Sequence, residues 1–307
     1  MKIHRLIQIF STYKRKISST FFSTPLSAQY AFTFTTRKSQ DLKLKSGKTI
    51  TITRRDLDAW KWFEDNNIEL AISPNGEYAF EYDELKFMLR CNSEDFHVFR
   101  EIFLEDHYKV KDMDFQSVVD VGGNIGLFSL AVAKRSENVV CVEPIPENIQ
   151  QIEQHMSINN ITNVKLLRAA ASDTANNQIS IYINSTNTGG HSMFKNWAAD
   201  QKSTDNLQEV IVNTVDLNTI LIEACNSVDY FKCDIEGSEF QLFKNSAPSS
   251  DSVAKLCLEI HISNDESIKD YQTLLNHFKQ SHYYLSDKGD NVSCPSNFIL
   301  HASSSPE

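Results

Sequence analysis

The sequence predicts an α/β fold with a mainly parallel sheet and helices on both of its faces. From about residue 110 onward, short apolar runs of strand length alternate with longer segments that have helical spacing. The clearest unit spans residues 117–143, where two apolar runs flank a glycine-rich loop and an apolar segment of helical length. The first run ends in Asp120 and the second in Glu143. This layout is typical of a nucleotide-like cofactor site at the carboxyl edge of a parallel sheet.

Residue spacing and proline positions define the helices that we expect. Apolar residues recur on one face of residues 95–108, which predicts a helix before the first strand of the repeat. Pro144 and Pro146 end the strand that carries Glu143, so residues 147–159 are predicted to form the next helix. Three further helices are expected, one opening at residues 214–217 and the others at residues 239–243 and 268–278.

Short apolar runs define the strands. Residues 228–233 form a run that ends at Asp234, and residues 253–260 form a run that ends near Glu259 and His261. The other expected strands are residues 164–167, 179–183, 283–285 and 298–301, of which 179–183 lies outside the core repeat. Because the carboxyl ends of strands in an open α/β sheet meet at one crevice, we expect these acids and the histidine to converge there.

The chain is predicted to divide into an N-terminal arm and small cap, residues 1–94, and a cofactor-binding domain, residues 95–307. Residues 41–95 read as short strands and turns, with clear strand alternation in residues 48–53. Residues 1–40 contain lysine and arginine but no acid. Two interpretations of this arm stay open: a basic segment that contacts an anionic membrane surface, or a partly ordered extension.

The composition excludes some classes of function. Hydrophobic residues make up 41% of the chain and charged residues 23%, which is ordinary for a globular protein. The formal net charge of -10 argues against nucleic acid as a partner. Cys141, Cys233 and Cys257 lie in apolar runs, so we expect buried free thiols and a cytoplasmic location. No stretch approaches the roughly 20 apolar residues of a membrane-spanning helix.

A long polar segment, residues 184–207, interrupts the repeat. Irregular stretches of this length are often lids or substrate loops, so we expect the segment to shape the choice of acceptor. His191 within it is a secondary candidate for acceptor binding.

The glycine loop indicates which cofactor binds. Its order is Asp120-x-Gly122-Gly123-x-x-Gly126, not the Gly-x-Gly-x-x-Gly of dinucleotide sites. Glycines let the backbone approach a ligand, but an acid at the mouth of the loop would repel a pyrophosphate. The acid suits a ligand with an ammonium group and a sulfonium, such as S-adenosylmethionine, and Glu143 can accept both ribose hydroxyls. A nicotinamide-dependent oxidoreductase is therefore the less favoured alternative.

The cluster at the other strand ends indicates removal of a proton from an acceptor hydroxyl. His261 is the best base by its intrinsic pKa, and Asp234 or Glu236 could be the base or could orient it. The competing interpretations are structural: His261 would cap a strand end, and Glu236 would stabilise a helix N-terminus. The same carboxylates could hold a divalent metal, but no dedicated ligand spacing is present, and we expect none.

These residues together resemble the FkbM family of S-adenosylmethionine-dependent methyltransferases. The motifs follow the family's order from about residue 95 to about residue 301, and residues 1–90 are not covered. Two of them are Val-Asp-Val-Gly-Gly-Asn-Ile-Gly at residues 119–126 and Lys-Cys-Asp-Ile-Glu-Gly-Ser-Glu at residues 232–239. The others lie at residues 99–103, 142–148, 159–160, 170–173 and 258–261.

The resemblance implies a class I methyltransferase (Rossmann-like) fold, with a seven-stranded sheet whose last strand is antiparallel. It implies methylation of a hydroxyl oxygen on a sugar, glycan or secondary-metabolite acceptor. A non-catalytic binding protein that keeps the fold is the alternative, but such a protein would be expected to have lost loop glycines or strand-end acids.

The resemblance also implies roles for individual residues. The implied cofactor site comprises Asp120, Gly122, Gly123, Asn124 and Gly126 in the loop, Glu143 at the ribose, and Ser172 or Asp173 near the adenine. Gly123 stands where many relatives carry alanine, a change that should still allow the turn.

Overall fold

A computed structural model describes residues 39–43, 49–73, 76–184, 207–262, 264–285 and 296–306. The chain divides into two compact units, Met1–His97 and Val98–Glu307. The sequence placed this boundary between residues 94 and 95. The residues predicted to carry the chemistry all belong to the second unit.

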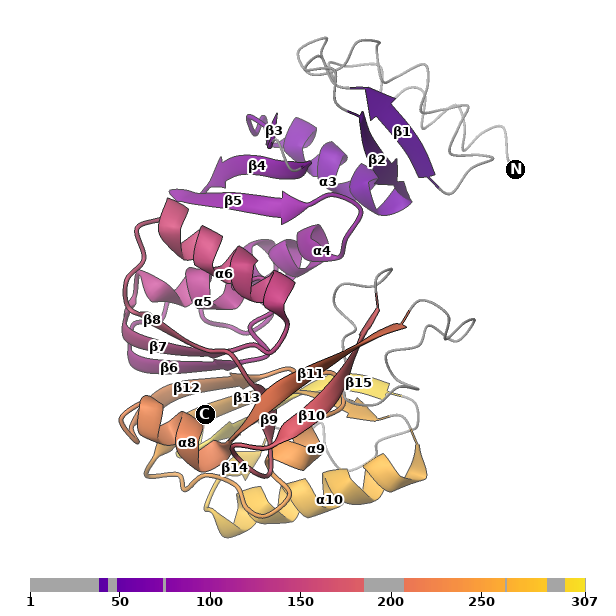
Figure 1. The fold of residues 1–307 in the computed structure, drawn as a ribbon. Helices are drawn as coiled ribbons and strands as arrows, with labels where there is room; N and C mark the ends of the chain where they lie inside the picture. The colour runs from indigo at the N-terminus through magenta and orange to yellow at the C-terminus, as the bar shows by residue number, and fades with distance from the viewer. Residues whose placement is uncertain are drawn as a thin grey trace, which may run out of the picture. The chain divides into compact units, whose positions relative to one another are not determined.

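The N-terminal unit contains a helix that the sequence analysis missed. Strands β1 (Ser39–Lys43) and β2 (Thr49–Thr53) form an antiparallel pair, and helix α3 (Arg54–Asp65) follows directly. A three-stranded antiparallel sheet follows, with strands β3 (Ala71–Ile72), β4 (Glu77–Tyr82) and β5 (Leu85–Arg90) (Figure 1). The prediction of strands and turns alone was therefore wrong for residues 54–65.

Buried hydrogen bonds explain why α3 forms. The Asp56 carboxylate accepts from the backbone N–H and the hydroxyl of Thr53, which satisfies a donor at the start of the helix. Its other oxygen, Oδ1, accepts from the Tyr78 hydroxyl at 2.7 Å, and Tyr78 in turn accepts from Trp60 Nε1 at 2.8 Å. Trp60 and Phe63 are three residues apart, and both are buried. The helix is thus held by contacts to β4 that are distant in the sequence.

The second unit is built on a seven-stranded sheet in the order β14-β15-β13-β12-β6-β7-β8. Neighbouring strands are parallel except that β15 is antiparallel to β13 and β14. The strands are β6 (Phe115–Val121), β7 (Ser136–Val142), β8 (Val164–Leu167), β12 (Val228–Cys233), β13 (Val253–Ile262), β14 (Tyr284–Leu285) and β15 (Ser296–Ser303). This arrangement confirms the predicted fold class, including the antiparallel last strand.

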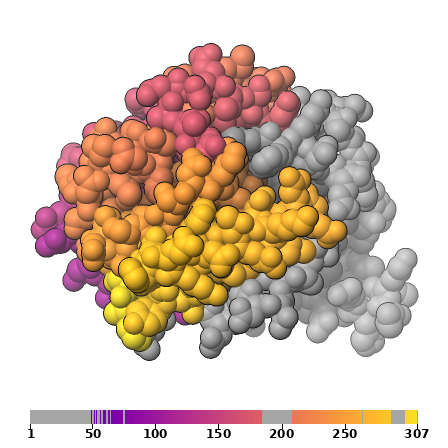
Figure 2. Space-filling view, turned by 90° about the horizontal axis from the view of Figure 1, so that it is seen from below, coloured from indigo at the N-terminus to yellow at the C-terminus, as the bar shows by residue number. Residues whose placement is uncertain are grey.

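Helices cover both faces of this sheet (Figure 1). Helices α5 (Leu127–Ala133) and α6 (Pro146–Ile158) lie on one face, and α8 (Leu217–Glu223), α9 (Glu239–Leu242) and α10 (Asp265–Gln280) lie on the other. Figure 2 views the second face, across which α10 runs in yellow-orange. Among the described residues, none of the helices has the length and apolar character needed to cross a bilayer.

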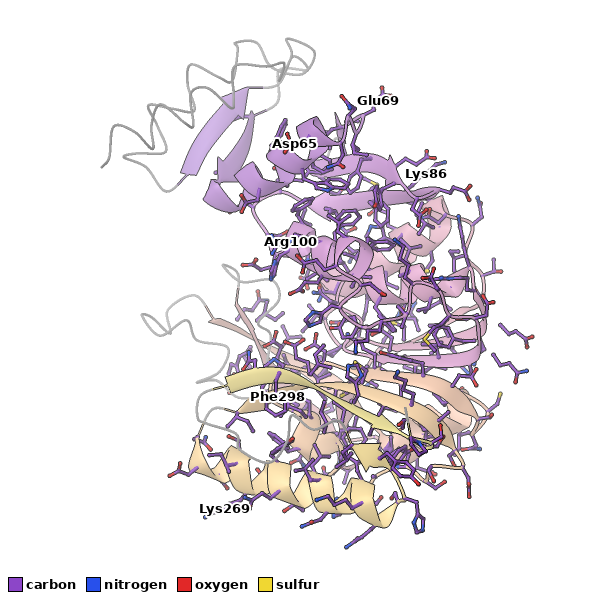
Figure 3. The ribbon with its side chains drawn as sticks, turned by 180° about the vertical axis from the view of Figure 1, so that it is seen from behind. Asp65, Glu69, Lys86, Arg100, Lys269 and Phe298 are labelled. Carbon is purple, nitrogen blue, oxygen red and sulfur yellow. The ribbon has the colours of Figure 1, made fainter. Side chains whose placement is uncertain are left out.

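Aromatic packing holds α10 against the sheet. The ring of Tyr271 on α10 meets the ring of Phe298 on β15 edge to face, with centroids 5.4 Å apart. Phe298 on β15 is labelled in Figure 3. Lys269, on the exposed side of α10, is labelled there too and points away from the sheet. The apolar residues of α10, whose spacing predicted a helix at residues 268–278, are therefore the ones that pack against the sheet.

The helix predicted at residues 95–108 is shorter and divided. It consists of α4 (Asp95–Phe99) and a π-helical turn, η1 (Arg100–Leu104). The backbone N–H of Glu105 donates to the carbonyl of Arg100 at 2.9 Å, a bond between residues five apart. The apolar spacing therefore marked the buried face correctly but not the end of the helix.

A second, smaller sheet flanks the main one. Its order is β10-β11-β9, with strands β9 (Ala170–Ser172), β10 (Gln178–Asn184) and β11 (Leu207–Asp216). The expected strand at residues 179–183 is confirmed as lying outside the core repeat. Strand β11 was not predicted, although Val212 and Thr214 are buried and alternate with the exposed Ile211. The helix expected to open at residues 214–217 begins at Leu217, and Asp216 caps it by accepting from the backbone N–H of Thr219.

Two close approaches shape the glycine loop after β6. A Cβ atom on Gly122 would lie 1.8 Å from the backbone carbonyl oxygen of Asp234, and the φ of Gly122 is +83°. Only glycine fits there. A Cβ atom on Gly123 would lie 2.3 Å from Cys141 Sγ. The turn forms with glycine at position 123, as expected, and the sulfur of Cys141 occupies the space that a methyl group would need.

A buried ion pair joins the two central strands. Asp120 on β6 and Lys232 on β12 are register partners, and Lys232 Nζ lies 3.2 Å from Asp120 Oδ1. Ser129 donates to Asp120 Oδ2 at 2.7 Å, and Lys232 Nζ donates to the carbonyl of Gly122 at 2.8 Å. Burial alone would lower the pKa of Lys232, but the charges of Asp120 and then Asp234 raise it, so the lysine stays charged.

We predict that Asp120→Asn lowers the free energy of unfolding by about 3–5 kcal/mol, because the buried charge of Lys232 loses its nearest counter-charge. Adding Lys232→Met to this variant should recover much of the loss. Urea unfolding measures both changes. Glu153→Gln is the control, since it breaks the exposed pair with Arg168 and should cost less than about 1 kcal/mol. The ion pair would not have this importance if Asp120→Asn cost no more than the control.

Candidate functional site

A cavity opens at the carboxyl ends of β6, β7 and β12. This is the position expected for a cofactor site in an open α/β sheet. Five of the predicted site residues line it: Gly122, Asn124, Glu143, Asp234 and Glu236. The rest of the lining is mainly apolar and comes from residues that include Ile145, Ile181 and Ile235.

Glu143 is held by the protein on both of its carboxylate oxygens. Oε2 accepts from the backbone N–H of Asn124 at 2.8 Å, and Oε1 accepts from the backbone N–H of Ile145 at 2.9 Å and from Asn148 Nδ2 at 3.2 Å. Burial raises the pKa of Glu143 to about 7, although these hydrogen bonds oppose the shift. A carboxylate has about four acceptor positions, so it retains capacity for a ligand hydroxyl.

Asn124 links the glycine loop to Glu143 and carries a buried side-chain acceptor without a hydrogen-bond partner among the described residues. Its backbone is left-handed, with φ of +48°, which aims its N–H at Glu143. Its side-chain Oδ1 is buried and makes no hydrogen bond within the described part of the chain. A buried acceptor without a partner is costly, so a ligand that donates a hydrogen bond here would relieve that cost.

The other predicted cofactor residues lie behind the lining. The Asp120 carboxylate is fully buried with Ser129 and Lys232, and Gly123 and Gly126 form the loop backbone. Ser172 and Asp173 do not line the cavity either.

Instead, Ala169, Ala170 and Ala171 line the cavity on the side where the adenine is expected. Ser172 donates to Asp173 Oδ1 at 3.2 Å, and Lys244 Nζ lies 3.5 Å from Asp173 Oδ2. The motif at residues 170–173 therefore reaches the cavity through its alanines.

On the opposite side of the cavity, the segment after β12 is fixed by a residue that the sequence analysis did not assign. Glu239 opens α9 and is completely buried. Its Oε1 accepts from the backbone N–H groups of Ile235 and Gly237 at 3.1 and 3.2 Å, and it lies 3.0 Å from His261 Nδ1. Asp234 and Glu236 are thereby held at the cavity wall. Glu239 is the last residue of the motif at residues 232–239, which also contains Asp234. This position in the sequence could have marked Glu239 as a site residue.

His261 is surrounded by carboxylates. Its Nε2 lies 3.8 Å from Glu236 Oε2 and 3.7 Å from Glu259 Oε1, while Glu239 faces Nδ1. Burial alone would lower the pKa of His261, but Glu239, followed by the other acids, raises it to about 10. Near neutral pH the imidazole therefore carries its proton, which does not favour its predicted role as the base.

Glu259 has the more suitable pKa. Burial and the nearby charge of Asp234 raise the pKa of Glu259 to about 8, while His261 opposes the shift. A carboxylate with a pKa near the working pH is a competent general base. Glu259 was predicted to lie at the strand end but not to act as the base, because a carboxylate pKa cannot be read from the type of residue alone.

Some predictions lie outside the described residues. They concern His191, nearly all of the polar segment at residues 184–207, and the basic arm at residues 1–38.

Comparisons with known proteins identify the family. A family model described as the methyltransferase FkbM domain matches residues 120–290. A curated protein from Beauveria bassiana (strain ARSEF 2860), described as methyltransferase 1, is 26% identical over 162 residues, which are 48% of this chain and 65% of that protein. The chain thus spans somewhat less than two thirds of the length of this relative.

Solved structures of similar proteins include an FkbM methyltransferase from Methylobacillus flagellatus KT. It is 17% identical, with a TM-score of 0.37, and the match covers 62% of this chain and 44% of that chain. Trm5b from Pyrococcus abyssi is 10% identical, with a TM-score of 0.40, and the match covers 83% of this chain and 71% of that chain.

The matched span is narrower than the resemblance implied. It begins at Asp120, so the motif at residues 99–103 lies outside it, and it ends at residue 290 and not near residue 301. It includes the glycine loop, Glu143 and the carboxylate cluster around His261, which consists of Asp234, Glu236, Glu239 and Glu259. Because the model matches more than half of the sequence, the expected family is confirmed, and the chain belongs to the FkbM methyltransferase domain family.

Proposed function

We propose that this protein transfers a methyl group from S-adenosylmethionine to a hydroxyl oxygen of a sugar, glycan or secondary-metabolite acceptor. Membership of the FkbM family supports the methyltransferase class. The observation that carries the proposal is the pairing of Glu143 with Asn124 at the wall of a cavity that follows a glycine loop. The acceptor class rests on the resemblance between this sequence and the family.

The residues present fit this cofactor. Glu143 would accept a ribose hydroxyl, and Asn124 Oδ1 would accept a donor from the ligand. The Gly122 backbone can approach the ligand without a side chain between them. Asp234 and Glu236 add negative charge at the wall, which suits a ligand with a sulfonium and an ammonium group.

Asp120 would act indirectly. Its charge is offset by Lys232, whose Nζ donates to the Gly122 carbonyl. We therefore assign Asp120 to positioning the loop, and Asp234 to facing the ligand ammonium. Ser172 and Asp173 would support the alanines that line the adenine side.

The residues of the carboxylate cluster would remove the acceptor's proton. S-adenosylmethionine, when bound, supplies a methyl carbon that passes to the acceptor oxygen as the carbon–sulfur bond breaks, with the electron pair remaining on sulfur. Glu259 would take the proton from the hydroxyl, since its pKa of about 8 suits a base near neutral pH. Glu236 would orient the acceptor, and His261 would hold the carboxylates in place.

We also propose a cytoplasmic location. Cys141, Cys233 and Cys257 are buried free thiols, as expected for a reducing compartment. The net charge of -10 disfavours nucleic acid as a partner. The basic residues in the segment 1–40 support peripheral contact with an anionic membrane surface.

Calorimetric titration tests the cofactor. We expect S-adenosylmethionine and S-adenosylhomocysteine to bind with dissociation constants on the order of micromolar. NAD should not bind, because the glycine loop lacks a dinucleotide fingerprint. Binding of NAD, or no binding of either adenosyl compound, would contradict the proposal.

The same titration predicts a dependence on pH. Ionised Glu143 accepts hydroxyl donors more strongly than its protonated form, so affinity should rise as the pH passes upward through about 7. If only the ionised form binds, the gain between pH 6 and pH 8 is about tenfold. Glu143→Gln should bind more weakly and lose this gain, whereas Glu147→Gln, an exposed neighbour, should keep it. Any change that remains in Glu143→Gln reports the amino group of the ligand.

A transfer assay tests the acceptor class and the base. Formation of S-adenosylhomocysteine should be seen with a panel of hydroxylated sugars or secondary metabolites but not with matched amines or thiols. With an active acceptor, Glu259→Gln should lower turnover by about 10²-fold or more and leave cofactor affinity unchanged. Glu266→Gln, an exposed acid at the start of α10, is the control. Unchanged turnover in Glu259→Gln would assign the base to Asp234 or Glu236.

A further inference from the structure

Three side chains beside the cavity converge as metal ligands do. Asp234 after β12, Glu239 at the start of α9 and His261 on β13 each place one ligand atom within 4.8 Å of the other two. Asp234 lines the cavity, so an ion could enter from that side, whereas Glu239 and His261 are almost completely buried. The three residues come from separate elements, and the fold alone brings them together.

Negative charge exceeds positive charge around this point. Four carboxylates surround the imidazole of His261: Asp234, Glu236, Glu239 and Glu259. Lys232 is the nearby cation, but it lies 3.9 Å from Asp234 Oδ2 and is engaged with Asp120 at 3.2 Å. Buried charges of one sign are stable only when a cation compensates them.

One buried oxygen in the cluster supplies independent evidence. Glu239 Oε1 accepts from two backbone N–H groups and faces His261, but Oε2 has no hydrogen-bond partner within the described residues. Glu239 is completely buried, so bulk water does not solvate this oxygen. A buried carboxylate oxygen without a donor is costly, and a metal ion is a ligand that satisfies it.

We propose that Asp234, Glu239 and His261 bind a divalent cation of the type that accepts both carboxylate oxygens and an imidazole nitrogen, such as Mn²⁺. Glu239 would contribute Oε2. Asp234 would contribute Oδ1, because Lys232 and Tyr108 are both near its Oδ2. Glu236 and Glu259 lie close enough to His261 to complete or orient the ligand set.

The role of this cation rests on the proposed methyl transfer, whereas its binding does not. An ion beside the cavity would draw an acceptor hydroxyl toward it and make that hydroxyl easier to deprotonate. Glu259, 3.7 Å from His261, would then receive the proton. The site would thus select acceptors that offer a hydroxyl, and favour those with a neighbouring oxygen as a second ligand.

Mn²⁺ titration followed by electron paramagnetic resonance tests the site in the full chain, without any adenosyl compound. We expect one bound ion per chain, with electron spin-echo modulation from an imidazole nitrogen. His261→Gln should lose the nitrogen signal, and Glu239→Gln and Asp234→Asn should each weaken binding by at least about tenfold. Asp251→Asn, which removes an exposed acid, should change neither reading. Thermal melts show whether each variant is folded. If Glu239→Gln does not fold, Asp234→Asn, which changes a residue at the cavity wall, tests the site in its place.

Two results would overturn the proposal. One is no bound Mn²⁺ at concentrations of about 1 mM. The other is binding by surface carboxylates instead of this site. It would show as binding without nitrogen modulation, or as binding that Glu239→Gln and Asp234→Asn leave unchanged. Calorimetry with S-adenosylmethionine is independent of these readings, so a failure of the metal site and a failure of the proposed function can be told apart.

Discussion

The buried pair of Asp120 and Lys232 is the interaction on which the site depends. It lies at the centre of the sheet, between β6 and β12, and each partner also holds a neighbouring element. Asp120 accepts from Ser129 on α5, and Lys232 fixes the carbonyl of Gly122 in the loop. Because Gly122 also approaches the backbone of Asp234 too closely for any side chain, the pair sets the spacing between the cofactor loop and the carboxylate cluster.

This spacing couples the two halves of the site. The loop side presents Asn124 and Glu143, which suit a nucleoside with free hydroxyls. The β12 side presents Asp234 and Glu236, backed by Glu239 and His261. A shift of either strand would move donors and acceptors together, so we infer that the geometry for binding and the geometry for proton removal are maintained by the same central contact.

Much of the fold followed from the sequence because the signals were local. Apolar runs of strand length marked every strand of the seven-stranded sheet, and the acids at their ends marked the edge where the cavity lies. Helix α3 and strand β11 were missed for different reasons. Helix α3 depends on contacts between Asp56, Trp60 and Tyr78 that are 18 to 22 residues apart. Strand β11 follows a polar segment, and its outward face carries polar residues such as Glu209 and Asn213.

The site was harder to predict in detail, because burial and charge are properties of the fold. An ordinary histidine pKa made His261 the natural base, but three-dimensional contact with Glu239 raises that pKa to about 10. The Asp120 carboxylate was expected to face a ligand, but Lys232, which is distant in the sequence, neutralises it. Glu143 and Asn124 were easier to place, since the loop and the strand end that carry them are close in sequence.

A crystal structure of the protein with S-adenosylhomocysteine would test the central claim most directly. We expect a ribose hydroxyl within about 3.2 Å of the Glu143 carboxylate and the adenine beside Ala169–Ala171. We also expect Asp120 and Lys232 to remain paired behind the loop, without contact to the ligand. A ribose bound elsewhere, or a ligand ammonium paired directly with Asp120 while Lys232 moves away, would contradict it.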